Sequence, residues 1–153
     1  MTSASLSTPV GEIHLHEDNG KLVRVTWDTS GLPTVRDTPL LATALDEVQA
    51  YFEGRLTRFS VPLALGPSEF QARFQRALLD IPFGETRTYG DLASDLGVSA
   101  QTIGQACGAN RLPVIVPCHR VLGASGLGGF SGGVGVETKV QLLRHEGAAG
   151  LLI

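Results

Sequence analysis

The spacing of apolar residues changes along this chain, from every second residue near its start to a helical spacing afterwards. Within residues 11–27, Ile13 and Leu15 alternate with polar residues, and Asn19-Gly20 separates this run from a second one. A period of two is typical of a half-buried strand, and Asn-Gly between two such runs strongly favours a β-hairpin. The alternating apolar residues of the second predicted strand are Val23, Val25 and Trp27.

Residues 28–39 are predicted to form a loop, because they are rich in glycine, proline, serine and threonine. A helix is predicted next, since apolar residues then recur at helical spacing and Gly54 is placed to end the helix. These apolar residues are Leu41, Leu45, Val48 and Phe52. We therefore assign residues 1–64 to a small N-terminal α/β domain, made of a β-hairpin or small sheet and one helix.

From Ser68 onward the pattern is mainly helical. Ser68 and Gln71 form a predicted capping box, and apolar residues then follow one helical face until Pro82. These residues are Phe70, Phe74, Leu78 and Ile81.

Two short helices are predicted after this one. A second capping box, Thr88 with Asp91, precedes a helix at residues 89–96 that ends at Gly97, and another helix follows at residues 100–110. Two short helices joined by a few residues that include a glycine are typical of a helix-turn-helix.

Three segments complete the chain: a short buried strand, a glycine-rich loop and a last helix, at residues 113–117, 123–135 and 137–147. The predicted fold class is α+β. Residues 65–153 are assigned to a mostly helical, winged-helix-like C-terminal domain that carries the helix-turn-helix and the active site.

Composition places the chain among ordinary globular proteins, with 42% hydrophobic and 18% charged residues. No run approaches the roughly 18 apolar residues that span a bilayer, and we find no secretory signal. We therefore expect a cytoplasmic protein without membrane association, in which Cys107 and Cys118 are free thiols. The net charge of −3 does not by itself indicate nucleic acid as a partner.

Cys118 is the residue that most directly indicates chemistry, because His119 and Arg120 follow it at once. The thiolate is the reactive form of cysteine, and a nearby imidazole can take its proton while basic groups stabilise the charge. Neighbours on a strand point to opposite faces, so pairing Cys118 with His119 requires a bridging water or a break in the strand after Pro117. Cys107, within a helix, is interpreted as a small buried hydrophobe.

Two more residues extend this pattern. Glu146 follows His145 near the end of the chain. It offers a carboxylate that can orient an imidazole, and it is equally suited to a solvated position on the last helical turn. Asn110 lies eight residues before Cys118, where it is also a common residue for ending a helix.

In combination, these segments resemble the O6-alkylguanine-DNA alkyltransferases, or methylated-DNA–protein-cysteine methyltransferases. The resemblance rests on ANRLPVIVPCHRVLGASG, on GETRTYGDLA before it, and on FSGG and KVQLLRHEG after it. It covers residues 68–147, and the hairpin unit fits the family's variable N-terminal domain in outline. It implies direct DNA repair, in which each protein molecule takes one alkyl group from O6-alkylguanine, or from O4-alkylthymine, after the base is flipped out from the minor groove.

The resemblance also implies roles for individual residues. Cys118 corresponds to the alkyl acceptor, and His119 to its base acting through a water molecule. Glu146 corresponds to the carboxylate that orients this imidazole, and Asn110 to the residue that ties the recognition helix to the active site. The residues implied in DNA and base binding are Thr88, Tyr89, Ala100, Gln101, Thr102, Gly104, Pro113, Arg120, Val121, Phe130 and Ser131.

Within that group, the resemblance implies that Tyr89 assists the leaving guanine and that Thr88 contacts a phosphate. The residues implied in lining the guanine pocket are Pro113, Val121, Phe130 and Ser131. The second helix of the helix-turn-helix would lie in the minor groove, where its small residues allow close approach with little positive charge.

Two positions depart from the family pattern. Gln101 stands where the family carries an arginine that fills the gap left by the flipped base, and Phe130 stands where the human-type proteins have a tyrosine. No cofactor is expected, and no metal site, since the N-terminal half has no cysteine and His14 and His16 are predicted to face solvent. The expected partner is double-stranded DNA containing O6-alkylguanine, bound by a monomer.

Three other functions share parts of this pattern. An alkyltransferase-like protein that binds lesions without repairing them has the same scaffold but lacks the reactive cysteine. A cysteine hydrolase with a Cys-His-Glu triad would turn over on an acyl substrate. A helix-turn-helix regulator would not need the thiol and would be expected to dimerise on a palindromic site.

Overall fold

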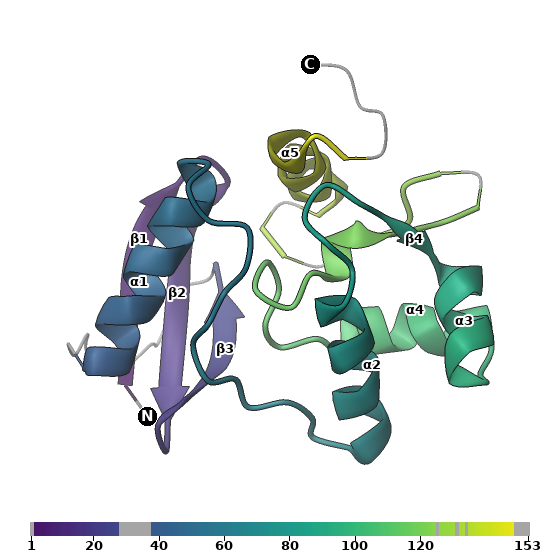
Figure 1. Ribbon diagram of the computed structural model, residues 1–153, viewed down its shortest axis with the longest axis horizontal. Helices are drawn as coiled ribbons and strands as arrows, with labels where there is room; N and C mark the ends of the chain where they lie inside the picture. Colours follow the sequence, from purple (N-terminus) through teal and green to yellow (C-terminus); the bar gives the residue numbers. More distant parts are fainter. Residues whose placement is uncertain (1, 28–37, 125, 131, 134, 149–153) are drawn as a thin grey trace. The chain divides into compact units, whose positions relative to one another are not determined.

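The computed structural model describes residues 2–27, 38–124, 126–130, 132–133 and 135–148. The chain divides into two compact units, residues 1–64 and 65–153. The first contains a small antiparallel sheet and the second is mainly helical (Figure 1), so the predicted α+β class is confirmed. Within the described residues, no helix is both long and apolar enough to span a bilayer.

A three-stranded antiparallel sheet, in the order β1-β2-β3, forms the N-terminal unit together with α1 (Figure 1). The strands are β1 (Thr2–Thr8), β2 (Gly11–Asp18) and β3 (Lys21–Thr26). The predicted hairpin is confirmed, because Asn19 and Gly20, with φ of 52° and 76°, form the tight turn between β2 and β3. β1 escapes prediction because its sequence, TSASLST, contains a single large apolar residue.

The register of the hairpin departs from simple alternation. A shift in pairing between His16 and Glu17 of β2 makes Val23 an extra residue in β3, as in a β-bulge. The buried residues of β3 are consequently Leu22 and Val25, while Val23 is only half-buried.

The prediction that the side chains of His14 and His16 face solvent is wrong. They do alternate with Ile13 and Leu15 along β2, but all four residues are buried. Both faces of β2 are therefore covered. The buried His16 side chain forms a hydrogen bond with Thr26, with 3.0 Å between Nε2 and Oγ1.

The predicted helix of this unit is α1 (Pro39–Phe52). Thr38 caps it by accepting the Leu41 N–H at 3.1 Å, and a proline at the first helical position loses no intrahelical hydrogen bond. The helix ends just before Gly54, whose φ is 78°.

Four described helices dominate the C-terminal unit: α2 (Glu69–Leu79), α3 (Tyr89–Leu96), α4 (Ala100–Gly108) and α5 (Val136–Glu146). Two short strands, β4 (Arg87–Thr88) and β5 (Val121–Leu122), pair in parallel. α3 and α4 pack together as the predicted helix-turn-helix (Figure 1). The core of this unit includes Phe74, Leu78, Leu92, Ile103, Leu112 and Leu142.

One predicted capping box forms and the other does not. The Asp91 N–H donates to Thr88 Oγ1 and the Thr88 N–H donates to Asp91 Oδ2, both at 3.0 Å. Ser68 accepts the Gln71 N–H at 2.9 Å, but the Gln71 side chain donates to the Ala106 carbonyl at 2.9 Å instead of returning to the cap. Gln71 therefore ties α2 to α4.

Residues 113–117 do not form the predicted strand. They are buried, but they run through turns, with the Val116 N–H donating to the Leu112 carbonyl at 2.8 Å and Val114 at a φ of 74°. The two prolines of this segment have no N–H for a sheet ladder. Apolar residues alone do not distinguish a buried strand from buried turns, which is why the prediction is wrong here.

Candidate active site

Cys118 begins a single turn of 3-10 helix, Cys118–Arg120, instead of ending a strand. Pro117 has φ −80° and ψ 66°, and the Cys118 N–H donates to the Val116 carbonyl at 2.8 Å, which is the geometry of an inverse γ-turn. The chain folds back at once, since the Arg120 N–H donates to the Pro117 carbonyl at 3.0 Å. The backbone therefore leaves the extended conformation after Pro117, as pairing of Cys118 with His119 requires.

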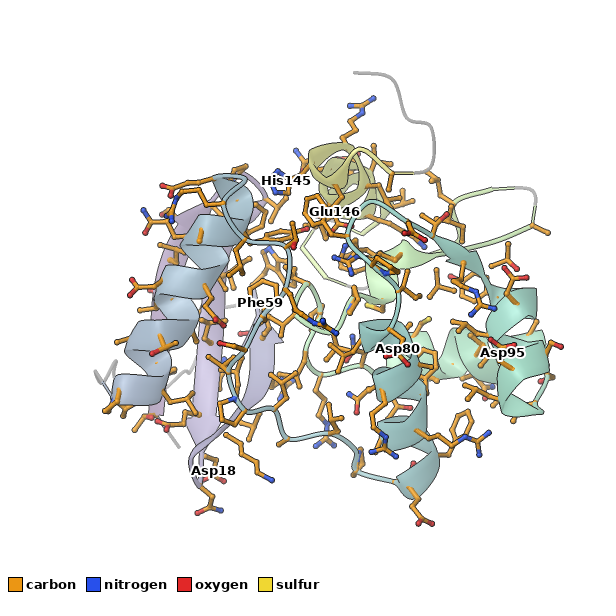
Figure 2. All side chains as sticks on the ribbon, in the orientation of Figure 1. Asp18, Phe59, Asp80, Asp95, His145 and Glu146 are labelled. Carbon is orange, nitrogen blue, oxygen red and sulfur yellow. The ribbon has the colours of Figure 1, made fainter. Side chains whose placement is uncertain are left out.

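The two residues after Cys118 bind one carboxylate, that of Glu146. Glu146 lies near the end of α5 (Figure 2). His119 Nε2 lies 2.8 Å from Glu146 Oε2. Arg120 donates to both carboxylate oxygens, from Nε at 2.8 Å and from Nη2 at 3.0 Å, and its Nη1 donates to the Ile81 carbonyl at 2.6 Å. All three side chains are buried, so they form a closed, charge-paired cluster.

The cluster fixes which of its groups is charged. Burial raises the pKa of Glu146, but the hydrogen bonds from His119 and Arg120, together with the positive charge of Arg120, outweigh it and lower the pKa to about 2. Burial lowers the pKa of His119, although Glu146 acts in the opposite direction. Since Arg120 already balances the carboxylate, we assign a neutral imidazole with its proton on Nε2. Its Nδ1 is then an acceptor, and no described residue hydrogen-bonds to it.

Asn110 organises the turns that lead to Cys118. Its Nδ2 donates to the Val116 carbonyl at 2.9 Å, and its Oδ1 accepts from the Leu112 N–H at 3.1 Å and from Gln75 Nε2 at 3.3 Å. Burial raises the pKa of the Cys118 thiol, and a hydrogen bond with Asn110 opposes this effect. The resting thiol is therefore protonated at neutral pH and needs a base.

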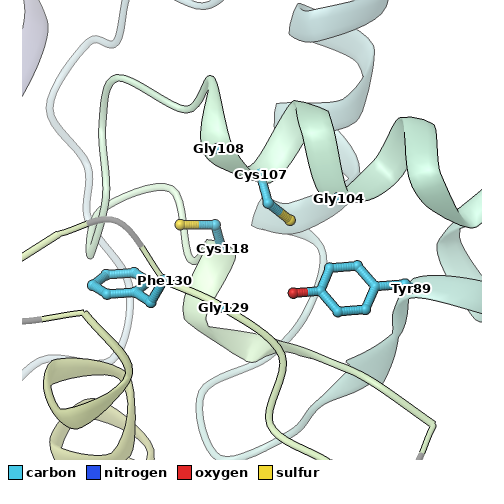
Figure 3. A pocket seen from close by; sticks show the side chains of 7 residues that line it. All are labelled: Tyr89, Gly104, Cys107, Gly108, Cys118, Gly129 and Phe130. Atoms are coloured by element: carbon cyan, nitrogen blue, oxygen red, sulfur yellow. The ribbon is translucent and has the colours of Figure 1, made fainter.

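Cys118 lines a pocket of about 400 Å³ (Figure 3). The other lining residues are Tyr89, Gly104, Cys107, Gly108, Gly129 and Phe130. The hydroxyl of Tyr89 points from the start of α3 toward the segments that carry Cys118 and Gly129 (Figure 3). Burial raises the pKa of this phenol, so it remains a hydrogen-bond donor.

The predicted site residues do not all meet at this pocket. Cys118, Tyr89, Gly104 and Phe130 line it, and the other predicted catalytic residues bond to the Cys118 segment or to each other. Pro113 and Val121 are buried, but they are not among the described residues that form its lining. Ser131 lies outside the described residues.

The residues predicted to bind DNA separate into two groups. Ala100, Gln101 and Gly104 are exposed on α4, while the Thr88 hydroxyl is used to cap α3. Arg120, which is also predicted to bind DNA or the base, is 6% exposed, and its guanidinium donates to Glu146 and to the Ile81 carbonyl. Its place is in the charged cluster.

Two residues near the pocket are missed by the sequence-based assignment. Cys107 lines the pocket together with Cys118. Lys139 of α5 is fully buried, donates from Nζ to the Val121 carbonyl at 2.6 Å and lies 5.8 Å from the centre of the Tyr89 ring. The sequence does contain a signal for the burial of Lys139. It lies three residues before Leu142 and seven before Glu146, and this helical spacing places all three on the buried face of the last helix.

We predict that Gly128→Ala slows any reaction that depends on Tyr89. A Cβ at Gly128 would lie 2.4 Å from the Tyr89 hydroxyl oxygen, and the φ of +73° disfavours a side chain. The cost of overpacking is about 1–3 kcal/mol, and thermal unfolding together with the single-turnover rate of the reaction at this pocket measures both effects. Gly126→Ala is the matched control in the same loop, because its Cβ would meet nothing within 4 Å. Equal behaviour of the two variants would contradict the prediction.

Among the described residues, no group of three or more histidine, cysteine or acidic side chains is arranged to hold a metal ion.

Comparisons with known proteins match nearly the whole chain. Residues 1–65 match the family model described as 6-O-methylguanine DNA methyltransferase, ribonuclease-like domain, and residues 69–148 match its DNA binding domain. A curated methylated-DNA–protein-cysteine methyltransferase of Mycobacterium tuberculosis is 41% identical over 150 residues, covering 93% of this chain and 90% of the relative. The constitutive protein of that name from Bacillus subtilis is 38% identical over 151 residues, covering 91% of each.

Solved structures agree with these matches. The crystal structure of Mycobacterium tuberculosis OGT in complex with DNA has a TM-score of 0.84 and 38% identity, covering 96% of this chain and 93% of that one. An O6-methylguanine DNA methyltransferase from Methanococcus jannaschii has a TM-score of 0.69 and 27% identity, covering 98% and 96%.

Proposed function

This chain belongs to the 6-O-methylguanine DNA methyltransferase family, and we propose that it repairs DNA by moving the alkyl group of O6-alkylguanine onto its own Cys118. The names of its relatives support the enzyme class of a methylated-DNA–protein-cysteine methyltransferase. One observation carries the assignment to a residue: Cys118 lines a pocket, and the next residue in the chain is a neutral imidazole bonded to an ionised carboxylate.

The proposed reaction begins with a proton transfer. The Cys118 proton passes through a bridging water to Nδ1 of His119, and Glu146 stabilises the imidazolium that forms. The thiolate attacks the alkyl carbon in line with its bond to O6. A C–S bond forms as the C–O bond breaks, and guanine leaves with the electron pair of that bond.

Tyr89 assists the departure of guanine by donating a hydrogen bond to it, and the proton held by His119 passes to the base through solvent. The product on Cys118 is a thioether, which has no carbonyl for water to attack. Each protein molecule therefore repairs one lesion.

The lesion must leave the duplex before the thiol can reach it. In our proposal, α4 enters the minor groove of double-stranded DNA, where its exposed Ala100 and Gly104 permit close approach, and the base turns into the pocket. The protein acts as a monomer, and O4-alkylthymine is a second substrate of the same chemistry.

Mass spectrometry tests this function directly. The protein is mixed with an oligonucleotide that carries O6-methylguanine, and the Cys118 peptide is expected to gain the mass of one methylene, with no gain in the Cys118→Ala variant. A methyl group on Cys107 instead, or lesion binding with no transfer, would overturn the proposal. The second of these outcomes would identify a lesion-binding protein.

We predict that Gln101→Arg speeds repair of duplex DNA. Gln101 is exposed on α4, and a longer cationic side chain should hold the extruded base out more strongly and attract phosphate. Recovering about 1.4 kcal/mol of the unstacking cost corresponds to roughly a tenfold faster rate. Second-order rates on duplex and single-stranded oligonucleotides measure this effect, because the single strand needs no extrusion. Equal changes on both substrates, or none, would show that Gln101 is not the intercalating residue.

A further inference from the structure

The pocket contains a second sulfur in addition to that of the alkyl acceptor. Cys107 of α4 and Cys118 both line it (Figure 3). The other described lining residues of α4 are Gly104 and Gly108, which have no side chains. Among the described residues of α4 that line the pocket, Cys107 is therefore the only one with a side chain.

Cys107 is not equipped to accept the alkyl group itself. Burial raises the pKa of its thiol to about 12, and the neighbouring Cys118 adds to this effect. At neutral pH the thiolate fraction is negligible, and the thiolate is the nucleophilic form. The Cys107 side chain is consequently a neutral, weakly polar group that occupies volume next to the reacting centre.

We propose that Cys107 determines how large an alkyl group the pocket accepts. This inference rests on the proposed function. During in-line attack by Cys118, sulfur and O6 occupy opposite sides of the reacting carbon, so the rest of the alkyl group must extend sideways. Gly104 and Gly108, on either side of Cys107 in α4, leave space along the helix, and Phe130 adds an apolar ring to the lining. The substrate class that fits is apolar alkyl groups larger than methyl, limited in size by residue 107.

The test compares O6-methylguanine and O6-benzylguanine in single-stranded oligonucleotides, which removes base extrusion from the rate. Second-order transfer rates are measured for the wild type and for Cys107→Ala, Cys107→Leu and Cys107→Ser. A single methylene in an apolar pocket changes discrimination by about 10- to 200-fold. Cys107→Leu should therefore lower the benzyl-to-methyl rate ratio at least about tenfold, and Cys107→Ala should raise the ratio.

Cys107→Ser is the matched control, because it keeps one heavy atom beyond Cβ and replaces the sulfur by an oxygen. It should retain the wild-type ratio, and a change as large as that of the alanine variant would overturn a role based on size. Equal effects of the alanine variant on both substrates would also overturn it, whether or not the leucine variant folds. A wild-type protein that takes no alkyl group from either substrate would instead overturn the proposed function itself.

Discussion

Glu146→Gln is expected to slow alkyl transfer by about 10²- to 10⁴-fold, the range seen when a carboxylate that orients a catalytic imidazole is neutralised. The carboxylate accepts the His119 Nε2 proton at 2.8 Å, which leaves Nδ1 as an acceptor. An amide can donate to Nε2 instead, and this favours the tautomer with its proton on Nδ1. The lone pair that the proposed reaction uses would then be lost. Single-turnover kinetics on a single-stranded substrate measures the effect without a contribution from base extrusion.

The same variant is expected to lose about 3–5 kcal/mol of the free energy of unfolding, the typical cost of breaking a buried ion pair. Arg120 is 6% exposed and donates to both oxygens of Glu146, so its charge would stay buried without a counter-charge. Urea unfolding measures this loss. Glu137→Gln, at an exposed site in the first turn of the same helix, is the control: it should cost at most about 1 kcal/mol of stability and leave the rate unchanged. A Glu146→Gln variant with wild-type kinetics would show that the carboxylate does not set the tautomer.

The pH dependence of stability provides a second check on Glu146. Its pKa is lowered from 4.5 to about 2 in the folded protein, so the unfolded chain binds the proton more readily. The stabilisation is therefore complete above about pH 4.5 and is lost as the pH falls through about 2. Because glutamine does not titrate, the difference in unfolding free energy between wild type and variant should shrink across this interval.

Elements with strong local signals are the ones that the sequence predicts well. The hairpin follows from Asn19-Gly20, where both residues adopt the positive φ that the turn needs. α3 follows from the Thr88–Asp91 capping box, whose two hydrogen bonds both form. These signals act over a few residues, so they do not depend on how the rest of the chain packs.

Features that depend on distant partners could not be predicted in the same way. Residues 113–117 are apolar enough for a strand, but side-chain hydrogen bonds from Asn110 hold this region in turns. The sequence predicts a role in DNA and base binding for Arg120, because the carboxylate that its guanidinium binds, Glu146, comes from a helix 26 residues further along the chain. The resemblance implies that Tyr89 and Phe130 lie near Cys118, and both line its pocket, whereas it does not indicate the buried Lys139 or the second thiol in the pocket.

Asn110→Ala is the second variant with a large expected effect. The side chain makes three hydrogen bonds to neighbouring groups, including those to the Val116 carbonyl and the Leu112 N–H. Each buried group left without a partner costs about 1–3 kcal/mol. Because the structure around the missing side chain can relax in part, we expect the free energy of unfolding to fall by about 2–4 kcal/mol. Because the turn that positions Cys118 loses its support, alkyl transfer should slow by about 10²-fold. Gln141→Ala, which removes an exposed amide on α5, is the control.

Asn110→Asp separates support of the turn from the effect of Asn110 on the thiol. Aspartate still accepts from the Leu112 N–H, but it cannot donate to the Val116 carbonyl and it places a negative charge beside Cys118. That charge opposes ionisation of the thiol and raises its pKa further, so the pH–rate profile should move to higher pH. The alanine variant adds no charge, and its profile should move less although its rate falls at every pH. If the two variants share one profile, Asn110 acts only on the position of Cys118 and not on its ionisation.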